Sequence, residues 1–254
     1  MKRLTIGGVW PDDAWVDRDK QAMCADFARY LPADADLVTA SHPVLPGPNT
    51  VVLGRAIADG GTVEEAARRV LRYRPDGIAY YCTTISFVRG PGGDRRLADA
   101  IFSATGLPAT TTSTAMIAAL QALDVRRISV ASPYLPDVEA MFVSFIEDHG
   151  VAVVASESMH LPDDHSIVPP QAMAEMAVAA DRPDAQAIFI GCSGQRLAGR
   201  LARIEQEVGK PVLSANQVTG WHMLRILGRT DRIPRLGALA DVRLAHAAEP
   251  LAAT

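Results

Sequence analysis

The sequence has little of the composition that assigns a protein quickly to a functional class. Aromatic residues make up only 6% of its 254 residues, and 25 lysines and arginines are outnumbered by 29 acidic residues. Nucleic-acid binding needs a concentrated basic face. The densest basic stretch, residues 68–74, lies beside Glu64 and Glu65 at helical spacing, which is typical of a solvated helix surface. We therefore expect no nucleic-acid partner.

Long apolar runs are also missing. No segment reaches the roughly 20 apolar residues of a membrane-spanning helix, and the N-terminus enters a short strand-like run without the features of a secretory signal. The three cysteines, Cys24, Cys82 and Cys192, are an odd number at wide spacing, which argues against a disulfide framework. These absences predict a cytoplasmic protein with reduced thiols and no membrane partner.

The common signatures of metal and nucleotide sites are absent too. There is no Cys-x-x-Cys and no His-Glu-x-x-His, so the usual zinc spacings are missing. The segment DDH at 163–165 precedes two prolines and is more typical of a turn or lid than of a metal site. The glycine-rich segment at 90–94 lacks the Lys-Ser/Thr of a phosphate loop, so we expect a flexible connection in which Asp94 caps the next helix. We predict no metal and no cofactor.

Short apolar runs alternate with amphipathic segments along the whole chain. This alternation is typical of an α/β fold, in which a parallel sheet carries helices on both faces and reactive groups collect at the carboxyl ends of the strands. The predicted strands are 4–9, 51–53, 77–81, 128–131, 151–155, 187–190 and 212–213, and the predicted helices are 18–30, 62–73, 95–105, 114–123, 136–149, 170–180, 197–208 and 217–227.

The sequence also repeats itself. The segment RPDGIAYYC at 74–82 resembles RPDAQAIFIGC at 182–192, and in both a polar corner opens an apolar strand that ends in cysteine. Further on, Ile101, Gly106 and Pro108 match Ile204, Gly209 and Pro211 in the same order. The repeat predicts two similar α/β halves, with a boundary near residues 112–114. From the general shape of such folds we expect the chain to return to the first half near Ser214, so that residues 1–113 and 215–254 form one half and residues 114–214 the other, with an active site in the cleft between them. The hydroxyl-rich segment at 109–114 offers N-caps for the helix at this boundary.

Each of two cysteines closes an apolar strand and precedes small residues, namely Thr83 and Thr84 after Cys82, and Ser193 and Gly194 after Cys192. Amides at such a turn favour negative charge, so they can stabilise a thiolate or hold a substrate carboxylate. A buried cysteine is often only a small apolar side chain, but its occurrence at matching places in both repeats favours a catalytic pair. Cys24 lies on an amphipathic helix and is expected to pack in the core.

Several motifs resemble those of the aspartate/glutamate racemase superfamily, within the branch that holds maleate isomerase, arylmalonate decarboxylase and the ectoine-utilization racemase-like proteins. The likeness covers nearly the whole chain, from about residue 6 to 228. Its motifs are CTTISFVRG at 82–90, GLPATTTSTA at 106–115, DVRR at 124–127, SPY at 132–134 and GCSG at 191–194.

This resemblance implies two flavodoxin-like, three-layer halves related by a pseudo-twofold axis, and a cofactor-free active site between them. It implies that Cys82 and Cys192 are the catalytic thiols. It also implies substrate contacts from Thr83 and Thr84, from the amides of Ser193 and Gly194, from the Tyr134 phenol, and from the N-terminal loop at Pro11 and Asp12.

The chain departs from each branch of the family at informative places. Arylmalonate decarboxylases have glycine in the place of Cys82, and maleate isomerases have an asparagine shortly after the position of Pro11, where this loop continues Asp12-Asp13-Ala14. The segments at 86–92 and 214–217 are most similar to the ectoine-utilization proteins. The acidic pair Asp12 and Asp13 would either meet a substrate amine or form a solvated loop.

Three functions remain open on these residues. The leading hypothesis is an isomerase or racemase of a small carboxylate, either a dicarboxylate or an amino-acid derivative, that uses two opposed thiols. The alternative is a decarboxylase of a malonate-type acid in which Cys192 is the proton donor. The third is a non-catalytic binder of small acids. Trp221, His222 and Met223 belong either to a subunit contact in a homo-oligomer or to helix packing.

Overall fold

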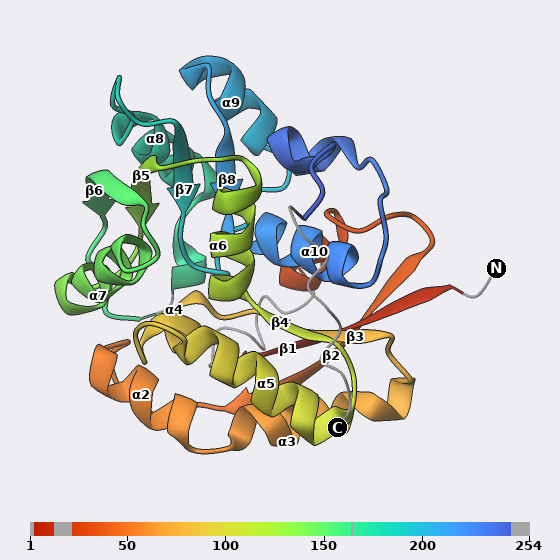
Figure 1. Cartoon of the computed structure of the whole chain (residues 1–254). Coiled ribbons are helices and arrows are strands. Elements are labelled where there is room, and N and C mark those ends of the chain that lie inside the picture. The colour runs from red at the N-terminus through yellow and green to blue at the C-terminus, as the bar shows by residue number, and fades with distance from the viewer. Residues whose placement is uncertain (1–2, 13–21, 164, 245–254) are drawn as a thin grey trace.

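The chain folds into two parallel four-stranded sheets flanked by helices (Figure 1). The computed structural model describes residues 3–12, 22–163 and 165–244. The strand orders are β2-β1-β3-β4 and β6-β5-β7-β8, so the two sheets have the same topology, as the repeat predicts. The strands are β1 (Leu4–Asp12), β2 (Ala35–Pro43), β3 (Gly77–Tyr80), β4 (Ala109–Thr111), β5 (Arg127–Ser132), β6 (Ala152–Ser158), β7 (Ala187–Ile190) and β8 (Val212–Ser214).

Helices connect successive strands, as parallel pairing requires. None of the helices in the described ranges is long and apolar enough to span a membrane. Residues 22–28 are helical, and the other helices are α2 (Val51–Asp59), α3 (Thr62–Val70), α4 (Thr83–Phe87), α5 (Gly93–Thr105), α6 (Thr112–Ala122), α7 (Pro136–Glu147), α8 (Pro170–Ala179), α9 (Leu201–Val208) and α10 (Ala215–Ile226), with 3-10 turns at Leu71–Tyr73, His165–Ile167 and Pro234–Leu239.

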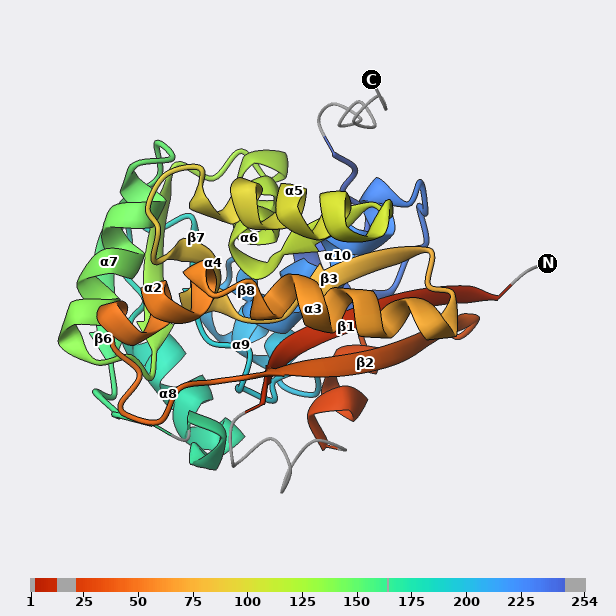
Figure 2. The same ribbon diagram turned by 90° about the horizontal axis from the view of Figure 1, so that it is seen from below.

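Two glycines let helices approach the two faces of the first sheet. A Cβ on Gly7 would lie 2.7 Å from a Val70 methyl of α3, and a Cβ on Gly77 would lie 2.9 Å from Met223 of α10. Because Gly77 pairs with Ile6, the residue before Gly7, the two glycines face opposite sides of the sheet. The sheet is therefore a middle layer, with α3 along β1 and β2 (Figures 1 and 2) and α10 against β3 and β4.

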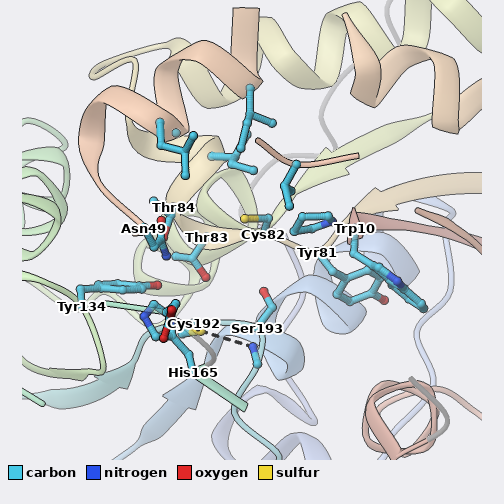
Figure 3. A pocket seen from close by; sticks show the side chains of 18 of the residues that line it. Trp10, Asn49, Tyr81, Cys82, Thr83, Thr84, Tyr134, His165, Cys192 and Ser193 are labelled. Carbon is cyan, nitrogen blue, oxygen red and sulfur yellow. Dashed lines mark hydrogen bonds between the residues drawn. The ribbon is translucent and has the colours of Figure 1, made fainter. Parts of the chain in front are cut away.

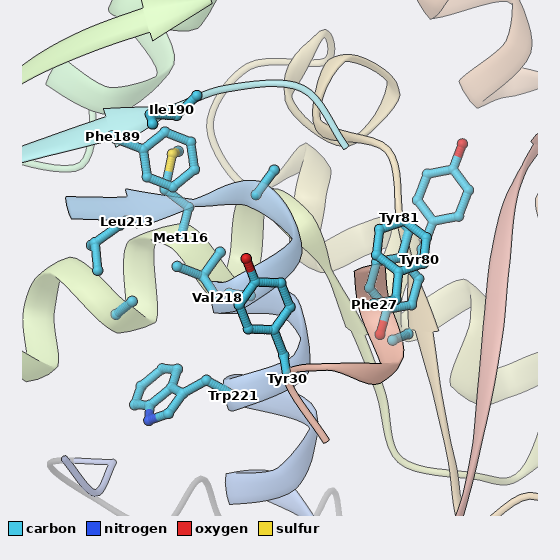
Figure 4. Close-up of a cluster of buried hydrophobic side chains, with 14 of the residues drawn as sticks. Phe27, Tyr30, Tyr80, Tyr81, Met116, Phe189, Ile190, Leu213, Val218 and Trp221 are labelled. Atoms are coloured by element: carbon cyan, nitrogen blue, oxygen red, sulfur yellow. The ribbon is translucent and has the colours of Figure 1, made fainter. Parts of the chain in front are cut away.

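Aromatic rings are few, but they gather in the core (Figure 4). Phe27 stacks on Tyr81 with ring centroids 4.2 Å apart, and Trp10 packs against both rings. All three side chains are at most 2% exposed. They fix the end of β1 against the end of β3, which is the edge of the sheet where Cys82 follows.

The structure differs from the predicted secondary structure at several places, and one of them is α4, which the prediction lacks. Residues 51–53, predicted as a strand, begin α2, because the Thr50 hydroxyl accepts from the Leu53 amide and caps a helix there. The strand β2 is absent from the prediction, since it lies at the sheet edge and is mostly half-buried, which leaves weak alternation in ADLVTASHP. The short strand β4 occupies a segment in which the sequence indicates only helix caps, and the helix predicted at 197–208 begins only at Leu201.

The cap predicted for α5 is also different. Gly92 occupies the cap position, and Asp94 is buried in the first turn, where its carboxylate accepts from the Thr114 hydroxyl at 2.8 Å. The expected N-cap of the following helix is confirmed, because Thr111 accepts from the Thr114 amide at the start of α6. Asp94 thus links α5 to α6 by a hydrogen bond and does not cap α5.

The first sheet is built from strands between residues 4 and 111, and the second from strands between residues 127 and 214. The helix α10 then returns to β3 and β4 of the first sheet. Trp221, His222 and Met223 on this helix are buried inside the chain, which favours helix packing over a subunit contact. The domain boundaries near 113 and 214 stay a prediction, as does a homo-oligomer.

Candidate active site

A cavity of about 510 Å³ lies where the carboxyl ends of β3 and β7 meet. Both Cys82 and Cys192 line it, and Figure 3 shows the two sulfur atoms at the same opening. The first half also contributes Trp10, Pro11, Met23, Val44, Leu45, Pro46, Gly47, Asn49, Leu53, Gly54, Ile57, Tyr81, Thr83, Thr84 and Ile85, and the second half contributes Tyr134, Asp163, His165, Ser193 and Gly194.

Cys82 is held at the junction of β3 and α4. It has extended backbone geometry at the N-cap position of α4 and is half-buried. The Ser86 hydroxyl contacts the carbonyls of Cys82 and Thr83, each at 2.8 Å, and pairs with the Ser113 hydroxyl at 2.6 Å. This buried network fixes the turn that presents Cys82 and Thr83 to the cavity.

Cys192 follows β7 with a backbone φ of 74°, in the left-handed region that favours glycine. A non-glycine residue keeps such a conformation only when its surroundings determine it, and such strain is common at functional sites. Here the backbone amide of Gly194 donates to the Cys192 sulfur at 3.4 Å, and the backbone amide of Gln195 donates to the Cys192 carbonyl at 3.2 Å. A tight turn therefore aims the thiol into the cavity.

Three buried hydroxyls at the cavity have no hydrogen-bond partner among the described residues: those of Thr83, Tyr134 and Ser193. An unpartnered buried hydroxyl costs about 1–3 kcal/mol, so native proteins rarely leave several together. Thr83 belongs to the first half of the chain, and Tyr134 and Ser193 belong to the second. This arrangement would suit the oxygens of a bound carboxylate.

Tyr134 is held rigidly and stays neutral. Its ring packs edge-on against Phe142, with centroids 5.7 Å apart, and the absence of a side chain at Gly191 leaves room for it. Burial raises the pKa of Tyr134 well above its ordinary value of 10.0, and the nearby Cys192 raises it further. Tyr134 is thus a hydrogen-bond donor throughout the physiological pH range.

One wall of the cavity is apolar. Leu53 and Ile57 of α2 and Ile85 of α4 lie on this wall, and the lining residues that the structure describes include no lysine or arginine. Carboxylate binding would therefore depend on hydroxyls and amides and not on a cation. Gly54 permits this wall to form, because a Cβ there would lie 3.0 Å from a methyl group of Val88.

A loop of the first half is hydrogen-bonded to the second half beside the cavity. The backbone amide of Asn49 donates to the Pro162 carbonyl at 2.6 Å, and the backbone amide of Val51 donates to the Asp137 carboxylate at 3.1 Å. Asn49 and Pro46 on this loop line the cavity. These two hydrogen bonds thus join the two halves next to the site.

The structure gathers most, but not all, of the residues that the sequence singles out. Pro11, Thr84 and Gly194 line the cavity together with the thiols and hydroxyls, whereas Asp12 at the end of β1 is exposed and does not line it. Asp13 lies outside the described residues. The substrate-binding roles of all these residues stay predictions. Cys24 is half-buried against the core, as expected for a packing residue.

Sequence reasoning left the role of His165 open, yet its ring lies beside Cys192, with Nδ1 3.6 Å from the sulfur. Sequence reasoning also missed Gln195 and Asn216. The side-chain amide of Gln195 donates to the backbone carbonyl of His165 at 2.8 Å, and the side-chain amide of Asn216 donates to the backbone carbonyl of Gln195 at 3.1 Å. A histidine in a Pro-flanked loop 27 positions before the cysteine was the available signal. In the described part of the chain, no group of three or more His, Cys, Asp or Glu side chains is arranged to hold a metal ion.

The chain is similar in sequence to arylmalonate decarboxylases and maleate isomerases. A sequence model of the family described as arylmalonate decarboxylase matches residues 58–240. Arylmalonate decarboxylase of Bordetella bronchiseptica is 28% identical over 237 residues, which is 87% of this chain and 99% of the relative. Maleate isomerase of Nocardia farcinica is 27% identical over 173 residues, covering 65% of this chain and 69% of the relative.

Solved structures share the fold. A crystal structure of arylmalonate decarboxylase has a TM-score of 0.75 at 27% identity, covering 94% of this chain and 99% of the other. Maleate isomerase of Pseudomonas putida S16 with maleate has a TM-score of 0.81 at 22% identity, covering 96% and 99%. Because the family match extends over most of the chain and includes both repeats' cysteine-bearing strands, this protein belongs to the arylmalonate decarboxylase family.

Proposed function

We propose that this protein is a cofactor-independent isomerase or racemase of a small carboxylate and that Cys82 and Cys192 act on opposite sides of the substrate. The observation that carries the proposal is the placement of both thiols on one cavity together with three unpartnered buried hydroxyls. The hydroxyls of Thr83, Tyr134 and Ser193 would hold a carboxylate and stabilise the enediolate formed from it.

Two reaction courses use these groups. In racemisation, one thiolate removes the α-proton, the electron pair moves into the carboxylate, and the opposite thiol donates its proton to the other face. In cis–trans isomerisation, one thiolate adds to an alkene carbon, the remaining C–C single bond rotates, and the thiolate leaves again. A cysteine-to-serine mutant of the maleate isomerase of Nocardia farcinica has been crystallised with a covalently bound succinylcysteine intermediate, which supports the second course in a relative.

The test compares wild-type protein with Cys82→Ala, Cys192→Ala and the control Cys24→Ala. Small dicarboxylates and amino-acid derivatives are incubated in deuterated water and followed by NMR. Either active-site substitution should lower the rate by roughly 10³-fold or more, the order that acid–base and covalent catalysis contribute, while Cys24→Ala should not. Solvent deuterium at carbon would indicate racemisation. A Cys82→Ala variant that keeps its rate would overturn the two-thiol proposal.

A decarboxylase of a malonate-type acid is the second candidate, and the apolar wall favours it. Leu53, Ile57 and Ile85 would remove water from a leaving carboxylate, which promotes loss of carbon dioxide, and Cys192 would protonate the enediolate. In that case Cys82→Ala would retain most of the rate and Cys192→Ala would lose it. Carbon dioxide release from a substituted malonate measures this directly.

A further inference from the structure

The His165 ring is positioned between a backbone carbonyl and the thiol of Cys192. It lies on the 3-10 turn His165–Ile167 and is only 5% exposed. Its Nε2 is 3.2 Å from the Leu161 carbonyl oxygen, and its Nδ1 is 3.6 Å from the Cys192 sulfur. Figure 3 shows the ring beside Cys192 at the edge of the cavity.

The carbonyl contact determines the tautomer of the ring. A carbonyl oxygen can only accept a hydrogen bond, so Nε2 must carry the proton that is donated to Leu161. In the neutral ring Nδ1 is then the nitrogen with the lone pair. The nitrogen that faces Cys192 is therefore an acceptor, and the thiol is the group that can donate to it.

The pair is held in this orientation by buried contacts. Gln195, which is 3% exposed, donates to the His165 carbonyl, and Asn216 holds Gln195 in turn. On the other side of the sulfur, the Gly194 amide donates at 3.4 Å and would stabilise negative charge there. The thiolate form of Cys192 thus has an amide donor and an adjacent imidazolium.

The two thiols differ in this respect. Among the described residues that line the cavity, His165 is the single histidine, and it lies at Cys192 in the second half. The other titratable groups facing the pair are Tyr134, whose ring centroid is 5.8 Å from that of His165, Cys82 across the cavity, and Asp163 on the same loop. Tyr134 is neutral, and a negative charge on Asp163 would favour the imidazolium.

We propose that His165 takes the proton of Cys192, so that the resting protein holds Cys192 as a thiolate. The proton moves from the sulfur of Cys192 to Nδ1 of His165, and no other bond changes. The role of this thiolate in turnover rests on the proposed function: in racemisation Cys192 removes the α-proton, and the opposite thiol, Cys82, donates its proton to the other face. The assignment disfavours the decarboxylase role of Cys192, which requires a proton on that sulfur at the start.

The test measures the reactivity of each thiol without any substrate, so its outcome is independent of whether a substrate is found. Wild-type protein, His165→Gln and the exposed control His160→Asn are alkylated with iodoacetamide between pH 5 and 9.5. Peptide mass spectrometry then gives a rate for each cysteine. Glutamine can keep the donor to the Leu161 carbonyl but has no basic nitrogen.

In wild-type protein, alkylation of Cys192 should reach half its maximal rate about one pH unit or more below the ordinary thiol value of about 8.5. In His165→Gln this midpoint should move up by about one unit, and the Cys192 rate at pH 7 should fall about tenfold. Cys82, Cys24 and the His160→Asn protein should not change. An unchanged Cys192 profile in a folded His165→Gln protein, or a wild-type Cys192 midpoint at about 8.5, would overturn the proposal.

A second measurement avoids the histidine variant altogether. Thiolate absorbs near 240 nm, so a pH titration of wild-type protein against Cys192→Ala gives the ionisation of Cys192 directly. The difference should already be present at pH 6. If absorbance is lost only in a comparison with Cys82→Ala, the assignment of the two thiols is reversed and the proposal fails.

Discussion

Tyr134 shows how a single residue can be functional and also cost stability. Its hydroxyl is buried at the cavity and has no hydrogen-bond partner among the described residues, while its ring is fixed by Phe87 and Phe142. Burial keeps its pKa well above 10.0, so the phenol cannot supply charge and can only donate or accept a hydrogen bond. The hydroxyl is therefore expected to meet a substrate oxygen.

We predict that Tyr134→Phe lowers kcat/KM about 10- to 100-fold on the substrate that the NMR screen identifies. A hydrogen bond to a charged group contributes about 1.5–3 kcal/mol, and each 1.4 kcal/mol is about tenfold in rate. The melting temperature should stay the same or rise, because an unpartnered buried hydroxyl is removed. The matched control is Tyr73→Phe, at a side chain that is 45% exposed. Equal kcat/KM in both variants would contradict the role given to Tyr134.

Among the elements, α3 lies close to β1, with Val70 directly over Gly7. The contact is possible because Gly7 has no side chain where it meets Val70, and Ile78 of the neighbouring strand fills the space beside it. The end of β1 carries Trp10 and Pro11 to the cavity, so the packing of α3 on this strand also positions the site. Any added atom at Gly7 must displace buried side chains.

Gly7→Ala should therefore lower the free energy of unfolding by about 1–3 kcal/mol, the usual effect of overpacking. The control is Gly60→Ala at the end of α2, where the backbone is in the right-handed helical region and the new Cβ would make ordinary contacts at 3.4 Å. That change should be neutral or stabilise by a few tenths of a kcal/mol. Urea unfolding curves of the two variants and wild type decide the point. Equal stability of all three would show that α3 can move away from β1 at no cost.

For the molecule as a whole, buried histidines determine part of the response to acid. Burial lowers the pKa of His42 and of His222 from 6.5 to about 4, and each is hydrogen-bonded in the core, His42 to Tyr80 and His222 to Thr110. Between pH 6.5 and 4 the unfolded chain binds a proton at these rings and the folded chain does not. Stability is therefore complete above pH 6.5 and falls as the pH drops through this window.

We predict that each of these histidines lowers the free energy of unfolding by about 2 kcal/mol when the pH falls from 7.5 to 5. His222→Asn, which keeps a polar group near Thr110, should lose less stability than wild type over this range. His149→Asn, at a half-buried surface position, should retain most of the dependence because His42 and His222 remain. Urea unfolding at pH 7.5, 6 and 5 measures the slopes, and parallel curves for wild type and His222→Asn would refute the prediction.

Glu139 makes the stability depend on pH in the opposite direction from the two histidines. Burial raises its pKa above 4.5, although hydrogen bonds from Ser132 and Ser156 partly lower it. Its contribution is therefore fully present below pH 4.5 and is lost as the pH rises through the raised value. Glu139→Gln should become more stable relative to wild type as the pH rises from 4.5 to 8, whereas the exposed Glu147→Gln on the same helix should not. Urea unfolding at those two pH values tests this.

The class of fold and the two thiols could be predicted from the chain alone. Strand–helix alternation depends on local hydrophobic periodicity, and the repeat around Cys82 and Cys192 is visible in the residues themselves. Prediction failed at residues 51–53, where a capping hydroxyl outweighed three apolar residues, and at β2, where an edge strand needs only one apolar face.

The set of polar groups that meet at the cavity depends on how the two halves pack. The pairing of His165 with Cys192 depends on the path of the loop after β6, which no spacing rule fixes. The absence of partners for Thr83, Tyr134 and Ser193 among the described residues is likewise a property of the packed halves and not of any one segment. Local sequence determines helices and strands, whereas the site results from contacts between residues far apart in the chain.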